Sequence, residues 1–453
     1  MPIFLAKPDR PRIARLAVCF LTPLLVSALV GVVWVPLARH QAEEYLELAM
    51  QAGGDSSLLR PPGYVAFLRM VGALAGGLDA ANFRAIYFAQ AVVHGCGAIA
   101  VYLVARRFLE ESAACLLALA YGCCPLAVML VGYVHYDSLH LGLLALSTLA
   151  VVEAFAGERP SWRWALAAGM VAGLATLTRP VTLFFPFTLA LALAWLRLGM
   201  PRERWLAWAA FTLAMTLTLA PRTWGNYQRT GRLIPINAQT GAAFWPMTEM
   251  VLSSDSDNFP WVPLWQQRGV PALTAKLGPV AQSPDFFQQQ PVRADAALAA
   301  LAVERFRAQP GVYFQNVACN TAFFWTGDSR RVFREFLFYQ FAEKSPPPNA
   351  PAVRYAIFLE VILKICAVVG QLIGCWRRNP AIVLGGALFL AIWALHALVY
   401  LDARYLYARL PFLFWFAAYG LREMLPARFQ ARDPFVASLL AGASLIGLGL
   451  LLA

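Results

Sequence analysis

The chain has 453 residues, of which 60% are hydrophobic and only 14% are charged, and its mean hydropathy is +0.57. A soluble protein of this length cannot bury so much apolar surface, so we expect an all-α integral membrane protein. The net charge of +12 does not indicate nucleic-acid binding, because most basic residues lie in short clusters between apolar runs, where loops meet anionic headgroups.

Eleven apolar runs follow one another along the chain, each close to the ~20 residues that cross the hydrocarbon core as a helix. They cover roughly 16–37, 84–105, 112–131, 139–156, 163–178, 181–198, 205–224, 354–375, 380–400, 405–424 and 434–452. The fifth and sixth runs are short and are broken at Arg179-Pro180, so we expect a tight pair of helices there.

The arginines between the runs predict the orientation of the chain. With a cytoplasmic N-terminus, the inner loops are the basic ones, carrying Arg106/Arg107, Arg159/Arg163, Arg197/Arg202/Arg204, Arg377/Arg378 and Arg422/Arg428/Arg432. The opposite short loops are poorer in arginine, and an odd number of spans places the C-terminus outside. We therefore predict a multi-pass protein of the cytoplasmic (inner) membrane.

Two outer segments divide the chain into three predicted parts. Residues 1–224 form an N-terminal transmembrane module of about seven spans, with a first outer loop at 39–83. Residues 225–352, rich in Trp, Pro, Gln and Asp, form an extracytoplasmic domain. Residues 353–453 form a C-terminal module of about four spans.

Candidate carboxylates lie in the first outer loop and at the start of the fourth run. Glu43 and Glu44 belong to an acidic helix that precedes Arg60 and a Pro-Pro turn, and a carboxylate there could remove a proton from an attacking hydroxyl. The alternative for that loop is a solvated helix and turn. Asp137 lies at the membrane surface, where it either works or caps the helix that follows.

Candidate phosphate-binding residues are the basic side chains predicted on the outer face, since guanidinium groups hold phosphate by paired hydrogen bonds. They are Arg60, Arg179, Arg222 and Arg404. The alternative is that at least some of them snorkel to lipid phosphates. No metal site is predicted, because His135, Asp137 and His140 form only a loose pattern. Within the eighth run, Glu360 and Lys364 are four residues apart and are expected to pair.

Six short motifs occur in order along the chain: Glu43-Glu44-Tyr45 followed by Leu46-Glu47-Leu48-Ala49; Arg60-Pro61-Pro62-Gly63-Tyr64; Asp137; Gly173-Leu174-Ala175-Thr176-Leu177-Thr178-Arg179-Pro180; Pro221, Asn226, Tyr227 and Gly231; and Arg404-Tyr405. In this pattern the chain resembles the polytopic GT-C-fold lipid-linked-sugar glycosyltransferases, a superfamily that joins dolichyl-phosphate-mannose protein mannosyltransferases with lipid A aminoarabinose transferases. The resemblance implies a GT-C-like helical bundle with an extracytoplasmic loop domain.

The resemblance also implies a reaction. A sugar would pass, with inversion, from a polyprenyl-phosphate carrier to a glycan, lipid or protein acceptor at the outer membrane face, with arginines holding the carrier phosphate. No cofactor is required, and a divalent metal is the minor alternative. Gln41 stands where the family has its catalytic aspartate, and glutamine cannot accept a proton at neutral pH. The predicted base is therefore Glu44 or Asp137, with Glu43 third.

Two other functions stay open. Gln41 favours a non-catalytic relative that binds a lipid-linked sugar. A transporter of lipid-linked glycans would also be helical with charges inside the membrane, but transporters more often show inverted repeats and lack a large outer domain.

Overall fold

The computed structural model describes residues 10–33, 41–50, 58–78, 83–196, 202–249, 265–283, 286–326, 351–399 and 403–424. All regular structure within these ranges is helical, which confirms the all-α prediction. The eleventh predicted run, 434–452, lies outside the described residues.

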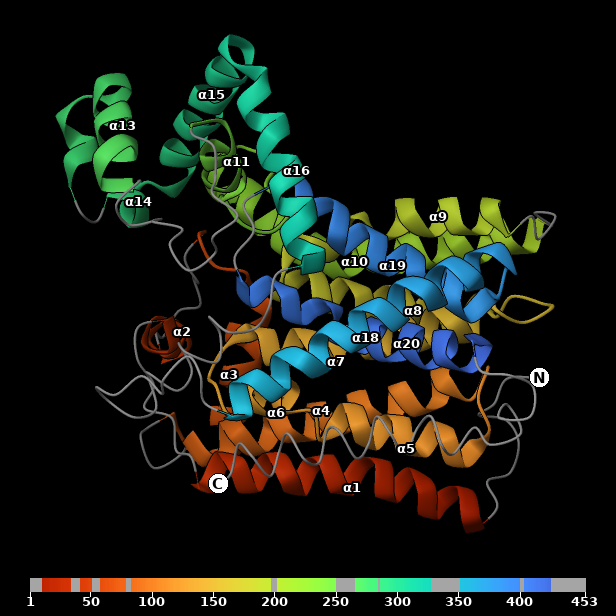
Figure 1. The fold of residues 1–453 in the computed structure, drawn as a ribbon. Helices are drawn as coiled ribbons and strands as arrows, with labels where there is room; N and C mark the ends of the chain where they lie inside the picture. Colours follow the sequence, from red (N-terminus) through yellow and green to blue (C-terminus); the bar gives the residue numbers. More distant parts are fainter. Residues whose placement is uncertain are drawn as a thin grey trace.

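A bundle of long helices makes up most of the molecule (Figure 1). In the N-terminal half, α1, α4, α7, α8 and α10 pack one against the next, and α18 pairs with α20 beside them. The bounds of the bundle helices are α1 Arg10–Val33, α4 Phe83–Ala105, α5 Glu111–Gly122, α6 Pro125–Val131, α7 Tyr136–Phe155, α8 Trp162–Thr178, η3 Pro180–Phe184, α9 Phe185–Trp195, α10 Arg202–Thr230, α18 Pro351–Trp376, α19 Pro380–Leu398, η7 Ala403–Arg409 and α20 Leu410–Met424.

Helices of spanning character are fewer than the sequence predicted. Among the described residues, four are long and apolar enough to cross a membrane: Pro11–Leu29, Arg84–Ala105, Tyr136–Phe155 and Pro380–Leu398. A fifth is added if α5 and α6, which are bent by 54°, count as one span. The count of eleven is not confirmed, partly because α8, α9 and α20 have 17, 11 and 15 residues, fewer than the ~20 of a full span.

The predicted break at Arg179-Pro180 is confirmed. Helix α8 ends at Thr178, Arg179 is extended (φ −153°, ψ 121°), and Pro180 opens the turn that leads into α9. Proline fixes this geometry, because it disfavours helical backbone in the residue before it and fits the first position of the helix that follows. The chain therefore turns at Arg179 and presents its side chain at the end of the bundle.

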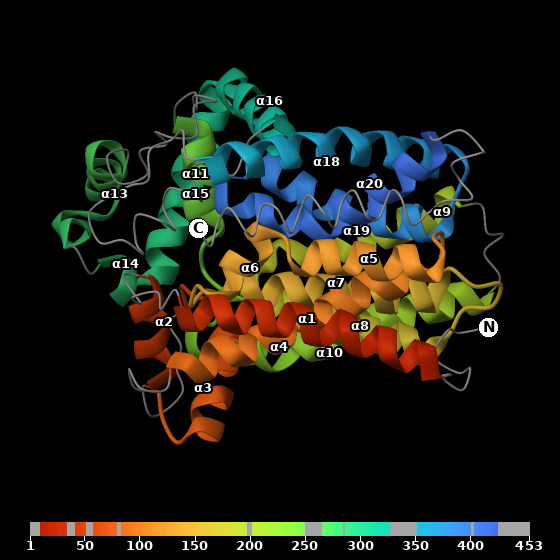
Figure 2. The same cartoon turned by 60° about the horizontal axis from the view of Figure 1, so that its bottom comes forward.

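A smaller helical domain projects from one end of the bundle, and we call it the outer domain. It comprises α11 Thr240–Glu249, a π-helical turn Trp265–Gly269, α13 Val270–Leu277, η6 Pro279–Gln282, α14 Phe286–Gln289, α15 Pro291–Ala308 and α16 Pro310–Thr326. Trp245, Leu273, Phe286 and Leu298 form its separate core. Helices α2 Gln41–Met50 and α3 Pro62–Ala75 lie at the same end of the bundle in both views (Figures 1 and 2).

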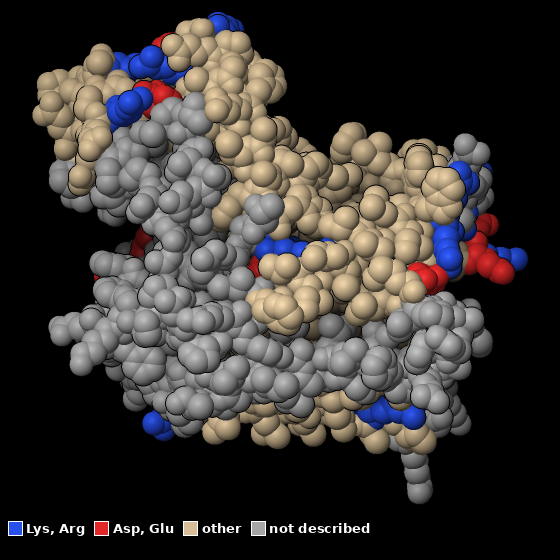
Figure 3. Space-filling view, in the orientation of Figure 1, with Lys and Arg blue, Asp and Glu red and all other residues tan. Residues whose placement is uncertain are grey.

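Charged side chains gather at the ends of the molecule. On the face shown in Figure 3, blue and red atoms of the described residues lie at the right-hand end of the bundle, in the outer domain and in one small group between these two regions, and the rest of the described surface is tan. Large apolar side chains such as Leu25, Leu217 and Leu372 are exposed on the bundle helices. An apolar belt between two charged ends is the surface expected of a bundle that sits in lipid.

Candidate functional site

The segment between α1 and α4 contains a bidentate ion pair. Arg60 Nε donates to Glu44 Oε1 at 2.8 Å, and Arg60 Nη2 donates to Glu44 Oε2 at 2.5 Å. Burial of the guanidinium is the largest effect and lowers its pKa. The hydrogen bond to Glu44 and the electrostatic interactions with Tyr45, Glu44 and Tyr136 together outweigh burial, so the pKa of Arg60 is raised above its usual value. Both side chains keep some exposure, 24% for Arg60 and 32% for Glu44. This pair is therefore within reach of a ligand.

The Arg60-Pro61-Pro62-Gly63-Tyr64 motif docks α3 onto the end of α8. A Cβ atom at Gly63 would lie 2.7 Å from both the backbone nitrogen and Oγ1 of Thr178, so only glycine allows this approach. Tyr64 donates its hydroxyl to Gln90 Oε1 at 2.7 Å and is fully buried. The loop that carries Arg60 is thereby fixed beside the residue that precedes Arg179.

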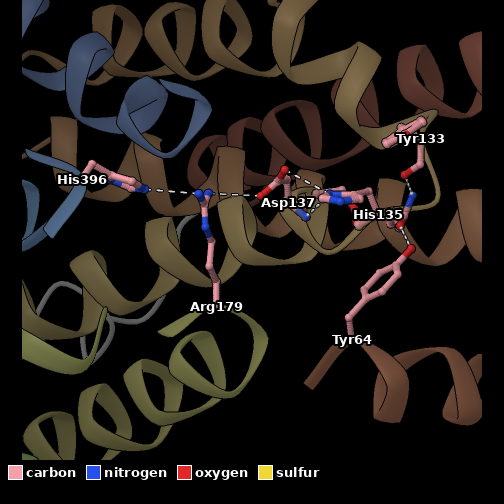
Figure 4. A network of polar contacts seen from close by, with 8 residues as sticks. Tyr64, Tyr133, His135, Asp137, Arg179 and His396 are labelled. Atoms are coloured by element: carbon pink, nitrogen blue, oxygen red, sulfur yellow. Dashed lines mark hydrogen bonds and ion pairs between the residues drawn. The ribbon is translucent and has the colours of Figure 1, made fainter. Parts of the chain in front are cut away.

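Asp137 lies in the first turn of α7 and does not cap it; His135 occupies the N-cap position. Arg179 Nη1 donates to Asp137 Oδ1 at 3.2 Å, and His135 Nδ1 lies 3.0 Å from Asp137 Oδ2 (Figure 4). The Asp137 amide nitrogen donates to His135 Nδ1 at 3.4 Å, so this ring nitrogen accepts as the N-cap of α7. Its contact with Oδ2 is therefore a close approach of the ring to the carboxylate without hydrogen-bond geometry.

Arg179 joins Asp137 to a second helix of the bundle. Its Nη2 atom lies 3.2 Å from His396 Nε2 on α19, while His396 Nδ1 lies 2.8 Å from the carbonyl of Ile392 (Figure 4). A carbonyl can only accept, so Nδ1 carries the proton and Nε2 accepts from Arg179. Asp137, Arg179 and His396 are all buried.

Two tyrosines connect the two ion pairs. The guanidinium carbon of Arg60 lies 5.8 Å from the centroid of the Tyr45 ring, and that of Arg179 lies 6.0 Å from the Tyr136 ring. The Tyr45 and Tyr136 rings are themselves 5.7 Å apart. These distances favour cation–π contact at both ends. These side chains form one cluster, which we call the outer-end cluster. It consists of Glu44 and Tyr45 of α2, Arg60 before α3, Tyr136 and Asp137 of α7, Arg179 after α8 and His396 of α19.

The predicted site residues are distributed unevenly. The outer-end cluster contains Glu44, Asp137, Arg60 and Arg179. Arg222 donates its Nε to the carbonyl of Ile236 at 3.1 Å and so holds the segment that follows α10. The side chains of Glu43 and Arg404 lie outside the described residues.

Sequence reasoning missed His396, which lies inside an apolar run. A lone ionisable residue in an otherwise apolar span is the signal that could have found it. The expected pairing of Glu360 with Lys364 is confirmed, with Lys364 Nζ 3.0 Å from Glu360 Oε1. Arg409 also donates to Glu360 and to the carbonyl of Phe324, a contact between distant segments that no local pattern indicates.

The described part of the chain contains no group of three His, Cys, Asp or Glu side chains placed to hold a metal ion. At the loose pattern of His135, Asp137 and His140, the Arg179 guanidinium already contacts Asp137 Oδ1 at 3.2 Å. A metal cation there would be repelled by the Arg179 guanidinium. These residues therefore do not fit a metal in this arrangement.

Residues 59–224 match the family described as dolichyl-phosphate-mannose-protein mannosyltransferase. No curated protein matches the chain. The matched region contains Arg60, Asp137 and Arg179, and Glu44 precedes it.

Solved structures with a similar fold include two of an archaeal enzyme. The oligosaccharyltransferase AglB from Archaeoglobus fulgidus, in complex with an inhibitory peptide and a dolichol-phosphate, has a TM-score of 0.52 and 15% identity over 95% of this chain and 55% of that chain. The Archaeoglobus fulgidus oligosaccharyltransferase complex with Zn and sulfate has a TM-score of 0.53 and 14% identity over 94% and 52%. The chain thus spans about half the length of these structures.

ArnT from Cupriavidus metallidurans bound to undecaprenyl phosphate is more weakly similar, with a TM-score of 0.43 and 16% identity over 88% of this chain and 77% of that chain. The helical bundle and the likeness to the two oligosaccharyltransferase structures show the fold, which is a GT-C fold. The resemblance that the motifs indicated is confirmed, with the mannosyltransferase family matched over residues 59–224.

Proposed function

We propose that the chain is a membrane glycosyltransferase that moves a sugar from a polyprenyl-phosphate carrier to an extracytoplasmic glycan, lipid or protein, with inversion at the anomeric carbon. The outer-end cluster carries this proposal. Segments far apart in the sequence bring two arginines and two carboxylates together beside the outer domain, and two of these residues pair across 42 positions of the chain. A site that transfers a sugar from a phosphate needs a cation to stabilise the leaving phosphate and a carboxylate to accept the proton of the acceptor.

In the proposed reaction the acceptor oxygen attacks the anomeric carbon as the bond from that carbon to the phosphate oxygen breaks. The acceptor proton passes to a carboxylate, and the polyprenyl phosphate leaves with the bonding electrons as an anion. An arginine stabilises the charge that develops on this leaving group, a task that preorganised donors perform well in a water-poor site. This chain supplies the base from Glu44 or Asp137 and the cation from Arg60 or Arg179.

Glu44 suits the base better than Asp137, because its ion pair can exchange partners. The carrier phosphate offers oxygens to the same two parallel N–H donors of an arginine, and its negative charge grows as the bond to the sugar breaks. When the carrier phosphate takes Arg60, Glu44 loses both of its hydrogen bonds and becomes a competent proton acceptor. Asp137, buried between Arg179 and His135, has no comparable exposure.

This exchange is testable by chemical labelling. Carbodiimide with an amine nucleophile modifies free carboxylates, and mass spectrometry reports each site. We expect Glu44 to be protected in the protein alone, to react once undecaprenyl phosphate is added, and to react without ligand in Arg60→Ala. Glu47, which is exposed on the same helix, is the internal control and should react throughout. Unchanged protection of Glu44 with bound undecaprenyl phosphate would exclude the exchange.

Catalysis itself is tested by transfer from polyprenyl-phosphate sugars to membrane acceptors. We expect transfer by the natural chain and its loss in Glu44→Gln. Transfer that survives both Glu44→Gln and Asp137→Asn would contradict the choice of base. Transfer that appears only in Gln41→Asp would show that the natural chain is a binding protein. That second function is favoured by Gln41 alone.

We also propose that the protein lies in the inner membrane with a cytoplasmic N-terminus, and that residues 225–352 and the C-terminus are extracytoplasmic. On α10, exposed Trp205 stands near one end and exposed Trp224 near the other, about 28 Å apart at 1.5 Å per residue. Aromatic residues at this separation match the two membrane interfaces, which supports α10 as a further span. Reporter fusions near residue 300 and at Ala453 test the orientation; cytoplasmic activity at either position would reverse it.

A further inference from the structure

Helix α16 connects the outer domain to the bundle, descending from α15 to the end of α19 (Figure 1). Asn316, Asn320 and Phe324 are spaced four residues apart on α16, and all three are buried. Residues at this spacing share one face of a helix. Two buried amides on that face need hydrogen-bond partners, and the partners lie on different helices.

Asn320 binds the end of α19. Its Nδ2 donates to the carbonyl of Val399 at 2.8 Å and to the carbonyl of His396 at 3.3 Å. The last carbonyls of a helix have no partner within the helix, so a side chain from elsewhere that supplies N–H groups holds that end in place. The atoms around Nδ2, which also include Met247 Sδ at 3.3 Å, are all acceptors, which fixes the orientation of the amide.

The turn of α19 that Asn320 holds is the one that carries the His396 ring. That ring accepts from Arg179 through Nε2 and stacks on Phe324 of α16, with centroids 5.9 Å apart and planes 21° from parallel. Asn320 thus fixes the backbone of His396 and Phe324 fixes its ring. The orientation of the Arg179 guanidinium toward Asp137 depends on both.

We propose that Asn320 is a positioning residue through which the outer domain holds Arg179 in its functional orientation, by way of His396. The inference rests on the proposed function, in which Arg179 is one of the two arginines that can stabilise the carrier phosphate. It makes α16 a rigid support of the site and not merely a connector. Positioning of a phosphate ligand within a fraction of an ångström is what such support contributes to binding and catalysis.

Asn316 provides a matched control on the same helix. Its Nδ2 donates to the carbonyl of Met247 on α11 at 2.8 Å, and it is as buried as Asn320. Both substitutions to alanine remove a buried amide of the same size from the same face of α16. Asn320→Ala removes the hydrogen bonds to the end of α19, whereas Asn316→Ala removes the bond from Nδ2 to α11.

The first measurement is the affinity of the full-length protein in nanodiscs for undecaprenyl phosphate. We expect about tenfold weaker binding for Asn320→Ala, of the order of losing a buried hydrogen bond, and little change for Asn316→Ala. His396→Ala should weaken binding as well, and adding Asn320→Ala to it should change nothing further. Additive effects, or equal effects of the two asparagine variants, would overturn the proposal.

The second measurement needs no ligand and separates this proposal from the proposed function. Hydrogen exchange of the peptide around Thr178 to Thr182 should become faster in Asn320→Ala and stay unchanged in Asn316→Ala. If the natural chain does not bind undecaprenyl phosphate, the proposed function fails while the exchange result still decides the coupling. If Asn320→Ala does not fold, Asn320→Asp, which keeps the size of the side chain and lacks the Nδ2 donors, replaces it in both measurements.

Discussion

The two ion pairs of the outer-end cluster have the same chemistry and opposite environments. Arg60 and Glu44 come from one loop, lie 16 residues apart, and keep 24% and 32% of their side chains exposed. Arg179 and Asp137 come from the ends of two helices, and only 8% and 3% of their side chains are exposed. Because the two pairs have the same charges, their different exposure to water must decide what each pair does.

Desolvation separates the roles of the two pairs. A part-exposed pair contributes little to stability, since water competes for both charges, and its partners exchange readily for a ligand. A buried pair has lost its water, so removing one partner leaves an uncompensated charge in a medium of low dielectric. We therefore expect Asp137 to hold Arg179 in a fixed orientation, and Arg60 and Glu44 to exchange partners during the reaction.

The largest expected effect on stability comes from the buried pair. Arg179→Ala or Asp137→Asn should lower the free energy of unfolding by about 3–5 kcal/mol, the usual cost of leaving a buried charge or donor without its partner. Thermal unfolding of the purified protein in detergent measures this loss. A shift in midpoint no larger than that of Glu44→Gln would show that the two pairs do not differ.

A smaller loss of stability is expected at the contact between Gly63 and Thr178, which brings the Arg60 loop beside Arg179. Gly63→Ala places a methyl group against the Thr178 backbone, where no space exists, so we expect about 1–3 kcal/mol of destabilisation. Because the α3 start and Arg179 both move, transfer activity should fall as well. Gly76→Ala, in which a Cβ meets no neighbouring atom, controls for a glycine substitution nearby, although the positive φ of 84° there adds strain of its own.

The exposed pair should contribute least to stability and most to activity. Arg60→Ala and Glu44→Gln should each change the free energy of unfolding by no more than about 1 kcal/mol. Transfer should fall about 10²- to 10⁴-fold in Glu44→Gln, the range expected for loss of a general base. Stability and transfer measured on the same preparations test this. A loss of several kcal/mol of stability in either variant would show that this pair holds the fold together, as the buried pair does.

The smallest change should follow Arg60→Lys. Lysine keeps the charge and loses the two parallel donors, so transfer and undecaprenyl phosphate binding should fall less than in Arg60→Ala. Stability should stay within the range of the natural protein. A lysine variant as defective as the alanine variant would mean that the paired geometry of the guanidinium, and not its charge, does the work at this position.

The sequence predicted the elements of the fold better than their contacts. The break at Arg179-Pro180 and the pairing of Glu360 with Lys364 were readable, because proline geometry and helical spacing act over a few residues. The bend between α5 and α6 was not, since the third apolar run reads as one uninterrupted span. Nor did the sequence indicate that Arg222 donates to the carbonyl of Ile236, while its role at the phosphate stays a prediction.

What the sequence determined by itself is the class of protein: hydropathy, arginine placement and the order of short motifs indicate a GT-C-like membrane bundle, because each of these properties is local. Only the tertiary structure decided that the predicted carboxylates and arginines pair with each other. Arg179 meets a partner 42 residues away in Asp137 and another 217 residues away in His396. Which charges share a buried site depends on how whole helices pack, and helix packing is set by surfaces that no short pattern contains.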